Sequence, residues 1–182
     1  MKASVFVGVS VDGFMARPDG ALDFLPAGGG EPHGYEEFMA TVDALVIGRH
    51  TYETVLGFDA WPYGSKRVFV LSTHVLASPP ADAAVEHLSG TPKDVACMLA
   101  ERGVRHAYID GGMTIQGFLR EGLIQRLIVT RVPVLIGSGI PLFGALPHDV
   151  ALKHIATRHY ASGLVQSEYE VLGEASAGDA AT

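Results

Sequence analysis

The sequence is poor in cysteine and contains no long apolar run. Because Cys97 is the single cysteine, no disulfide can form within the chain, which is typical of a reducing compartment. No apolar stretch reaches the roughly 18 residues that a membrane-spanning helix needs, and residues 1–8 lack the pattern of a signal peptide. We therefore expect a cytoplasmic protein with no membrane partner.

Positive charge is also scarce. Lys and Arg number 13 against 20 Asp and Glu, which gives a formal net charge of −7, and the basic residues form no cluster. Contacts between cationic side chains and phosphates supply much of the affinity of proteins for nucleic acids. We therefore expect no nucleic-acid partner, whereas a small phosphorylated molecule needs only a few local donors.

Several motifs that would indicate other chemistry are absent. The eight histidines include no His-Glu-x-x-His pair and no close Cys/His cluster, so we expect no metal site. Gly137-Ser138-Gly139 begins like a dinucleotide fingerprint, but Leu142 stands in the place of its third glycine. This departure excludes a Rossmann motif at that position.

What the sequence does contain is an alternation of apolar and amphipathic segments, and its 182 residues suit a single domain. Apolar runs predict strands, and helical spacing of apolar residues predicts helices. The predicted strands lie near residues 5–9, 44–47, 67–71, 107–110 and 127–132. The predicted helices lie over residues 32–42 and 114–120, and two more begin near His50 and after Thr91. Segments 154–160 and 164–172 flank a turn and predict an antiparallel hairpin. We thus predict a three-layer α/β domain over residues 1–173, with a mixed, mostly parallel sheet, and a flexible tail over 174–182.

The third predicted helix has the clearest local signals. Thr91 can cap its start, Pro92 suits the first helical position and Asp94 completes a capping-box pattern. Gly103 is typical of a residue that follows a helix end. We expect the helix to run between these two signals.

Three of the predicted strands are followed by small, hydroxyl-bearing or basic residues. These segments are Gly48-Arg49-His50-Thr51, Ser72-Thr73-His74 and Gly111-Gly112-Met113-Thr114. Ligands of α/β sheets bind beyond the carboxyl ends of the strands, and the free N–H groups of a helix N-terminus bind anions. Together the segments predict a site for a ligand with separated phosphates, although each alone is also typical of an ordinary turn.

The same segments carry a family resemblance. The run from Gly48 to Glu53 resembles the Gly-Arg-x-Thr-aromatic-Glu motif of dihydrofolate reductases, which contacts the phosphates of NADPH. The run from Tyr108 to Gly112 resembles the second cofactor motif, whose paired glycines commonly carry a cis peptide, and Val70-Leu71-Ser72 resembles the segment that reaches the adenosine ribose. The resemblance extends over about residues 3–172.

This resemblance implies a dihydrofolate-reductase-like fold with NADPH as the cofactor. Arg49, Ser72 and Thr73 are the expected partners of the 2′-phosphate, which favours NADPH over NADH. The full set of cofactor contacts that the resemblance implies is Val9, Ser10, Gly48, Arg49, Thr51, Leu71, Ser72, Thr73, Gly111, Gly112, Met113, Thr114 and Ile115.

A closer resemblance is to the C-terminal reductase domain of bifunctional riboflavin-biosynthesis deaminase-reductases and to its stand-alone relatives. It is carried by Ser10-Val11-Asp12-Gly13, by residues 122–127 and by residues 133–139 with Pro141-Leu142-Phe143. Stand-alone relatives commonly form homodimers, so the resemblance implies a homodimer here. The chain has no ligands for the zinc deaminase domain of the bifunctional enzymes, which excludes a complete two-step enzyme.

Acidic residues are the candidates for the substrate side of the site. Asp12 follows the first strand, and the resemblance places it near the nicotinamide as a catalytic candidate; the alternative is an Asx-turn with Gly13. Asp23 lies in a Gly- and Pro-rich stretch, 16–34, which is either a lid or a plain connector. Glu37 lies in the helix where true dihydrofolate reductases hold the pterin, or it is an exposed helix residue.

The resemblance implies hydride transfer from NADPH to a pterin- or pyrimidine-type small molecule, in a reaction like that of 5-amino-6-(5-phosphoribosylamino)uracil reductase or dihydrofolate reductase. In such enzymes the cofactor supplies the hydride, and the protein orients the reactants and excludes water. Two alternatives to an enzyme stay open. One is a non-catalytic module of the same fold that binds NADPH or a nucleotide. The other is a purely structural partner.

Overall fold

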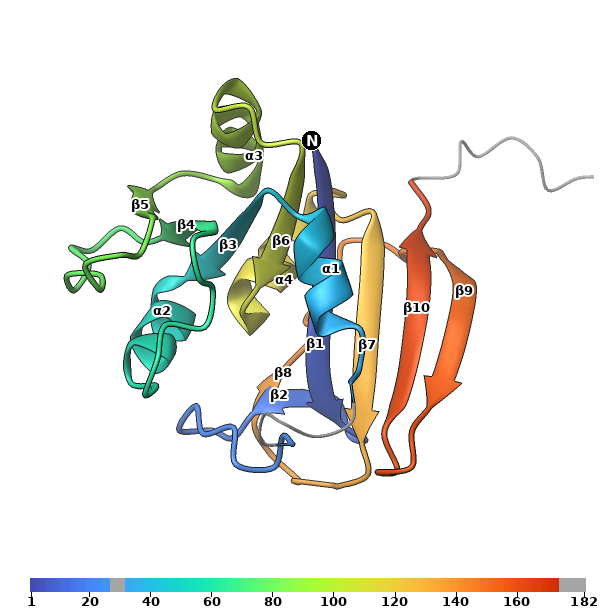
Figure 1. Cartoon of the computed structure of the whole chain (residues 1–182). Helices are drawn as coiled ribbons and strands as arrows, with labels where there is room; N and C mark the ends of the chain where they lie inside the picture. The colour runs from blue at the N-terminus through green and yellow to red at the C-terminus, as the bar shows by residue number, and fades with distance from the viewer. Residues whose placement is uncertain (27–31, 174–182) are drawn as a thin grey trace, which may run out of the picture.

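The computed structural model describes residues 1–26 and 32–173. Its main sheet has eight strands in the order β5-β4-β3-β6-β1-β7-β10-β9, and Figure 1 shows them from the green β5 edge to the orange β9 edge. These strands are β1 (Lys2–Ser10), β3 (Ala44–Gly48), β4 (Arg67–Leu71), β5 (Val85–Leu88), β6 (His106–Asp110), β7 (Arg126–Val132), β9 (Leu152–His159) and β10 (Val165–Val171). The predicted tail, 174–182, lies outside the described residues.

β1 lies in the middle of the sheet, parallel to both of its neighbours, β6 and β7. Its side chains alternate between the two faces: Val5 and Val7 belong to the core on one face, and Phe6 packs against the core on the other. A strand that is covered on both faces needs apolar residues at nearly every position. This burial explains the continuous apolar run in the sequence.

The six strands from β5 to β7 are all parallel, so their carboxyl ends meet at one edge of the sheet. The register places Gly48 opposite Leu71 and Ile47 opposite Asp110. The ends of β3, β4 and β6 are therefore level with one another. Segments that follow these strands can line a common site.

The remaining two strands, β10 and β9, are antiparallel: β10 pairs with β7 and β9 pairs with β10. The turn between them contains Gly163, whose φ of +86° suits glycine. Figure 1 shows this hairpin as the orange-red edge of the molecule. The predicted mixed sheet with a C-terminal antiparallel hairpin is confirmed.

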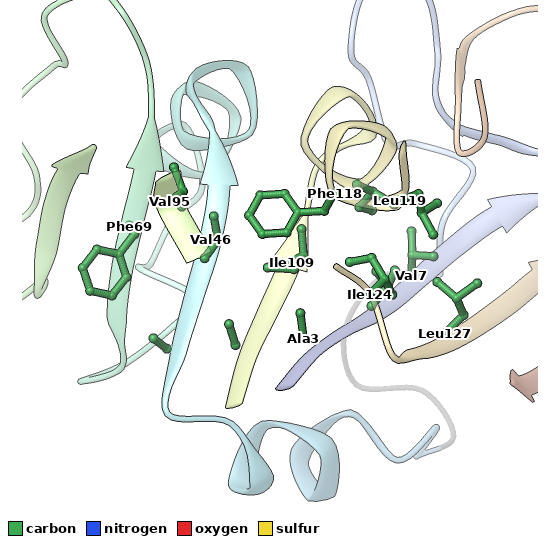
Figure 2. Close-up of a cluster of buried hydrophobic side chains, with 14 of the residues drawn as sticks. Ala3, Val7, Val46, Phe69, Val95, Ile109, Phe118, Leu119, Ile124 and Leu127 are labelled. Atoms are coloured by element: carbon green, nitrogen blue, oxygen red, sulfur yellow. The ribbon is translucent and has the colours of Figure 1, made fainter. Parts of the chain in front are cut away.

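Helices cover both faces of the sheet, which gives three layers. α1 (Tyr35–Thr41) and α2 (Arg49–Leu56) pack on one face, and α3 (Pro92–Glu101) and α4 (Gly112–Arg120) pack on the other. Figure 2 shows Phe118 of α4 and Val95 of α3 next to Val46 and Ile109 of the sheet. Each fully buried side chain of this kind contributes about 1.5–3 kcal/mol, so the core holds the start of α4 against the ends of β3 and β6.

The predicted capping of α3 is confirmed. Thr91 Oγ1 accepts a hydrogen bond from the Asp94 backbone N–H at 3.2 Å, and Asp94 Oδ2 accepts one from the Thr91 N–H at 3.0 Å. Arg102 is the C-cap, and Gly103 follows with φ +78°. Among the described residues no helix has both the length and the apolar character to traverse a bilayer.

Some elements differ from the sequence predictions. The edge strand β5 was missed, and so were β2 (Phe14–Ala16) and β8 (Ile140–Pro141), which form a separate two-stranded sheet; such short strands carry too little periodicity to be recognised. α1 begins at residue 35 rather than 32, and α4 begins at Gly112 rather than 114. The described residues contain no cis peptide bond, so the cis bond that the resemblance implies at Gly111-Gly112 is not found.

Candidate functional site

A cavity of about 780 Å³ lies at the edge of the sheet where β3, β4 and β6 end. This volume is ordinary for a site that binds a small molecule. Its described lining comes from the ends of these strands, from β1, β2 and β8, from α2 and α4, from the tip of α1 and the start of α3, and from the segments after β2, α2 and β4. The cavity therefore occupies the place where the sequence predicted a ligand.

The first turns of α2 and α4 form the middle of the cavity. Gly48 and Gly111 are their N-caps, and no side chain caps either helix, so first-turn N–H groups are available to an anion. The two turns interlock: a Cβ on Gly111 would lie 2.5 Å from Thr51 Oγ1, and a Cβ on Gly48 would lie 3.0 Å from Thr114 Oγ1. Gly111 also has φ +93°. Glycine is therefore required where the two helix ends meet.

The end of the cavity next to β4 carries its cationic and hydroxyl groups. The Arg49 guanidinium donates to Glu53 Oε1 at 2.7 Å, which uses one of its five N–H donors. The Ser72 hydroxyl accepts from the His74 N–H at 2.8 Å and donates to the His74 carbonyl at 2.9 Å. Ser72 thus closes its own turn, and the Thr73 hydroxyl contacts His74 Nδ1 at 3.2 Å. Arg49 is therefore the best placed partner for an anion at this end.

The part of the cavity next to β1 and β6 is aromatic. Phe6, Tyr35, Tyr63 and Tyr108 line it, although they come from four separate segments of the chain. The rings of Phe6 and Tyr35 lie 5.5 Å apart, and the Tyr108 hydroxyl donates to the Phe6 carbonyl at 2.7 Å. Aromatic walls of this kind suit a flat ring and exclude water.

Asp110, the last residue of β6, places a carboxyl group among these rings. It lies on the same face of β6 as Tyr108 because strand residues alternate, and its Oδ1 accepts from the Gly111 N–H at 2.7 Å. Burial raises the pKa of Asp110 from 3.8 to about 6. Burial, and then the charge of Asp110, raise the pKa of Tyr35 to about 12. A carboxyl group with a pKa near 6 can exchange a proton close to neutral pH.

Most of the cofactor residues that the resemblance implies lie together in the lining. They are Gly48, Arg49, Thr51, Leu71, Ser72, Thr73, Gly111, Gly112, Met113 and Thr114. Val9, Ser10 and Ile115 lie outside it. Val9 and Ile115 are buried in the core, and Ser10 Oγ accepts from the Phe14 N–H at 3.0 Å. These three residues support the walls of the cavity rather than form its surface.

Asp12, the catalytic candidate, also lies outside the lining, and its side chain is engaged elsewhere. Its carboxylate accepts from the Gly137 N–H at 2.8 Å and from the Ile136 N–H at 3.3 Å. A hydrogen bond from Ser10, together with these backbone groups, lowers the pKa of Asp12. In the structure, Asp12 therefore anchors the segment between β7 and β8 through these two hydrogen bonds.

The two other acidic candidates are likewise outside the lining. Asp23 Oδ2 accepts from the Arg17 guanidinium at 2.9 Å, and both side chains are exposed. Glu37 is exposed in the first turn of α1. Neither of these two carboxylates faces the cavity. Among the described lining residues, the acidic residue is Asp110.

Reasoning from the sequence missed the aromatic part of the site. Tyr35, Tyr63 and Tyr108 are far apart along the chain, so no spacing connects them. Asp110 did carry a signal, because it is a polar residue at the end of an apolar strand and directly precedes paired glycines. That position alone does not distinguish a turn residue from an acid that faces a ligand.

Comparison with known proteins reveals the relationship of the chain to a family. Residues 2–166 match the RibD C-terminal domain. The chain belongs to this family. A curated relative, the uncharacterized protein YwjB of Bacillus subtilis (strain 168), is 32% identical over 174 residues, which span 92% of this chain and 97% of YwjB.

Solved structures of other proteins have the same fold. A riboflavin biosynthesis-like protein of Shewanella sp. PV-4 is 38% identical, with a TM-score of 0.86 over 95% of this chain and 100% of that one. The Thermotoga maritima diaminohydroxyphosphoribosylaminopyrimidine deaminase/5-amino-6-(5-phosphoribosylamino)uracil reductase is 14% identical, with a TM-score of 0.70 over 94% of this chain and 56% of that one. The family and the predicted three-layer α/β fold are thus confirmed.

Proposed function

We propose that this chain is an NADPH-dependent reductase that transfers a hydride to a pyrimidine- or pterin-type heterocycle. The observation that carries the proposal is one continuous cavity with two chemically different ends. The guanidinium at one end and the helix N-termini in the middle suit a dinucleotide. The other end offers aromatic walls and an acid, which suit a heterocycle. Membership of the RibD C-terminal domain family supports the same conclusion.

The middle and the cationic end of the cavity fit NADPH. The uncapped first turns of α2 and α4 would hold the diphosphate, and the glycine N-caps leave room for it. Arg49 would bind the 2′-phosphate together with Thr73, whose hydroxyl has one side-chain partner, His74 Nδ1 at 3.2 Å, whereas the Ser72 hydroxyl both donates and accepts within its own turn. When bound, NADPH supplies the hydride.

The aromatic end would hold the substrate and supply the proton. Reduction of a C=N bond by hydride leaves a nitrogen that must be protonated. Asp110 is the one acidic residue among the described residues that line the cavity, and its pKa of about 6 suits a general acid. The surrounding rings exclude water, which strengthens the interaction of Asp110 with a bound heterocycle.

Calorimetric titration of the protein with NADPH and with NADH tests the cofactor assignment. The Arg49→Ala variant should bind NADPH about ten- to a hundredfold more weakly and bind NADH nearly as before, because a charge-assisted hydrogen bond contributes about 1.5–3 kcal/mol. Glu53→Gln releases the guanidinium from its ion pair and should tighten the binding of NADPH. Arg120→Ala, at the far end of α4, is the matched control.

Two outcomes would contradict these assignments. Equal weakening of NADPH and NADH binding by Arg49→Ala would refute the role of Arg49 at the 2′-phosphate. Failure of the unmodified protein to bind either cofactor would refute the proposed function. Steady oxidation of NADPH in the presence of a pyrimidine or pterin substrate would distinguish an enzyme from a module that only binds the cofactor.

A further inference from the structure

Charge is distributed unevenly within the cavity. Among the described residues that line it, the basic side chains are Arg49, His50 and His74, which belong to the first turn of α2 and to the segment after β4. The sheet order β4-β3-β6-β1 separates this end from the aromatic part beside β1. The aromatic part contains Asp110 and no lysine, arginine or histidine among its described lining residues.

Arg17, a cation just outside the lining, is paired with a carboxylate. Arg17 follows the lining residue Ala16, and its guanidinium forms paired hydrogen bonds with the Asp23 carboxylate, one of them at 2.9 Å. Residues 27–31 and 174–182 contain no Lys or Arg in the sequence. These two segments therefore add no Lys or Arg side chain.

Helix N-termini also bind phosphate. Gly90 and Pro92, at the start of α3, line the cavity, but the Thr91–Asp94 capping box already occupies the N–H groups of Thr91 and Asp94 there. The first turns of α2 and α4 face the dinucleotide in the proposed function. The first turn of α1, which brings Tyr35 to the aromatic part, contains Glu36 and Glu37. Two carboxylates in that turn disfavour an anion there.

The Asp110 carboxyl group adds a second obstacle to an anionic ligand. Its Oδ1 accepts from the Gly111 N–H, and no described residue donates a hydrogen bond to its Oδ2. A carboxylate in this position attracts N–H donors of a ligand and repels a phosphate dianion. The aromatic part thus has aromatic walls, one carboxyl group and no cation among its described lining residues. Such a site suits a neutral, flat molecule with N–H groups at its edge.

We propose that the substrate is a planar nitrogen heterocycle that carries no phosphate and that presents an N–H edge to Asp110. This inference rests on the proposed reductase function and narrows its substrate class. It separates this chain from the Thermotoga maritima protein, whose name specifies a phosphoribosyl substrate.

A matched pair of compounds tests the inference. The protein is first titrated with NADP⁺ and then, as the saturated complex, with 5-amino-6-(5-phosphoribosylamino)uracil or with the same compound lacking its phosphate. We expect the compound without phosphate to bind about tenfold more tightly, a difference of about 1.4 kcal/mol, and to be turned over faster with NADPH. Equal affinity, tighter binding of the phosphorylated compound, or binding of neither would overturn the inference.

Variants connect this preference to Asp110. Asp110→Asn removes the charge and should reduce the discrimination between the two compounds from about tenfold to about threefold or less. Asp43→Asn, at the amino-terminal end of β3, should leave the discrimination between the two compounds unchanged. The first titration separates the two failures: no cofactor binding refutes the reductase itself, whereas cofactor binding with a preference for the phosphorylated compound refutes only the substrate class.

Discussion

Replacing Asp110 with asparagine should make the protein more stable at neutral pH while removing most of its activity. The pKa of Asp110 is about 6 in the folded protein against an ordinary 3.8, so the folded state binds the proton more tightly than the unfolded state. The carboxylate therefore costs stability as the pH rises from about 4 to 6, and the full cost applies above pH 6. The pKa difference corresponds to about 3 kcal/mol at pH 7.

Asparagine preserves the local contacts of Asp110. It has nearly the same volume, and its Oδ1 can accept the Gly111 N–H as the carboxylate does at 2.7 Å. The substitution thus removes the buried charge and leaves the packing intact. We expect the free energy of unfolding at pH 7 to rise by about 1–3 kcal/mol, and the gain to vanish towards pH 4.

The assay is urea unfolding at pH 4 and at pH 7, followed by the fluorescence of Trp61, the single tryptophan. Asp43→Asn serves as a control in which the expected change in stability at pH 7 has the opposite sign. Asp43 Oδ2 accepts from the N–H groups of His106 at 2.9 Å and Arg105 at 2.8 Å, which lower its pKa. Its contribution to stability is present at pH 7 and is lost as the pH falls, so its replacement should destabilise the protein at pH 7.

The same Asp110→Asn variant should reduce the rate of NADPH oxidation with substrate by about a hundredfold, the usual effect of removing a general acid. A variant that is more stable and less active is the expected signature of a residue kept for function. A buried charge at Asp110 is ruled out if Asp110→Asn is less stable than the unmodified protein at pH 7, or if its gain in stability is the same at pH 4 and pH 7.

Two other features lead to further predictions. Gly111→Ala should cost about 2–5 kcal/mol, because it combines the strain at φ +93° with a clash against Thr51; Gly103→Ala, with φ +78° and open space, should cost only the strain. Adding Thr51→Ala should recover part of the Gly111→Ala loss, and no recovery in urea unfolding would refute the interlocked helix ends. Leu152 and Ile155 are exposed on the edge strand β9, which favours the predicted homodimer, and a monomer mass by light scattering at micromolar concentration would contradict it.

The parts of the fold that were predictable have signals within a few residues. The apolar run of β1 and the capping box at Thr91 identify a buried strand and a helix start without reference to the rest of the chain. β5 carries no such signal, since its middle residues Glu86 and His87 are exposed at the edge of the sheet. Edge strands are short and solvated, so the pattern that reveals a central strand is missing there.

The candidate site was predictable only in part for a related reason. The glycines at positions 48 and 111 lie at strand ends and belong to recognisable motifs. The role of Asp12 depends on a backbone partner, Gly137, that lies 125 residues away, and the aromatic part depends on four separate segments. Such contacts arise from the tertiary structure, so the sequence alone pointed to Asp12 and overlooked Asp110 as the acid that faces the cavity.

A crystal structure of the NADPH complex is the most direct test of the proposed cofactor site. We expect the diphosphate at the first turns of α2 and α4, the 2′-phosphate within hydrogen-bond distance of Arg49, and the nicotinamide next to the aromatic part that contains Asp110. A complex with the 2′-phosphate away from Arg49, or with the nicotinamide outside this cavity, would contradict this expectation.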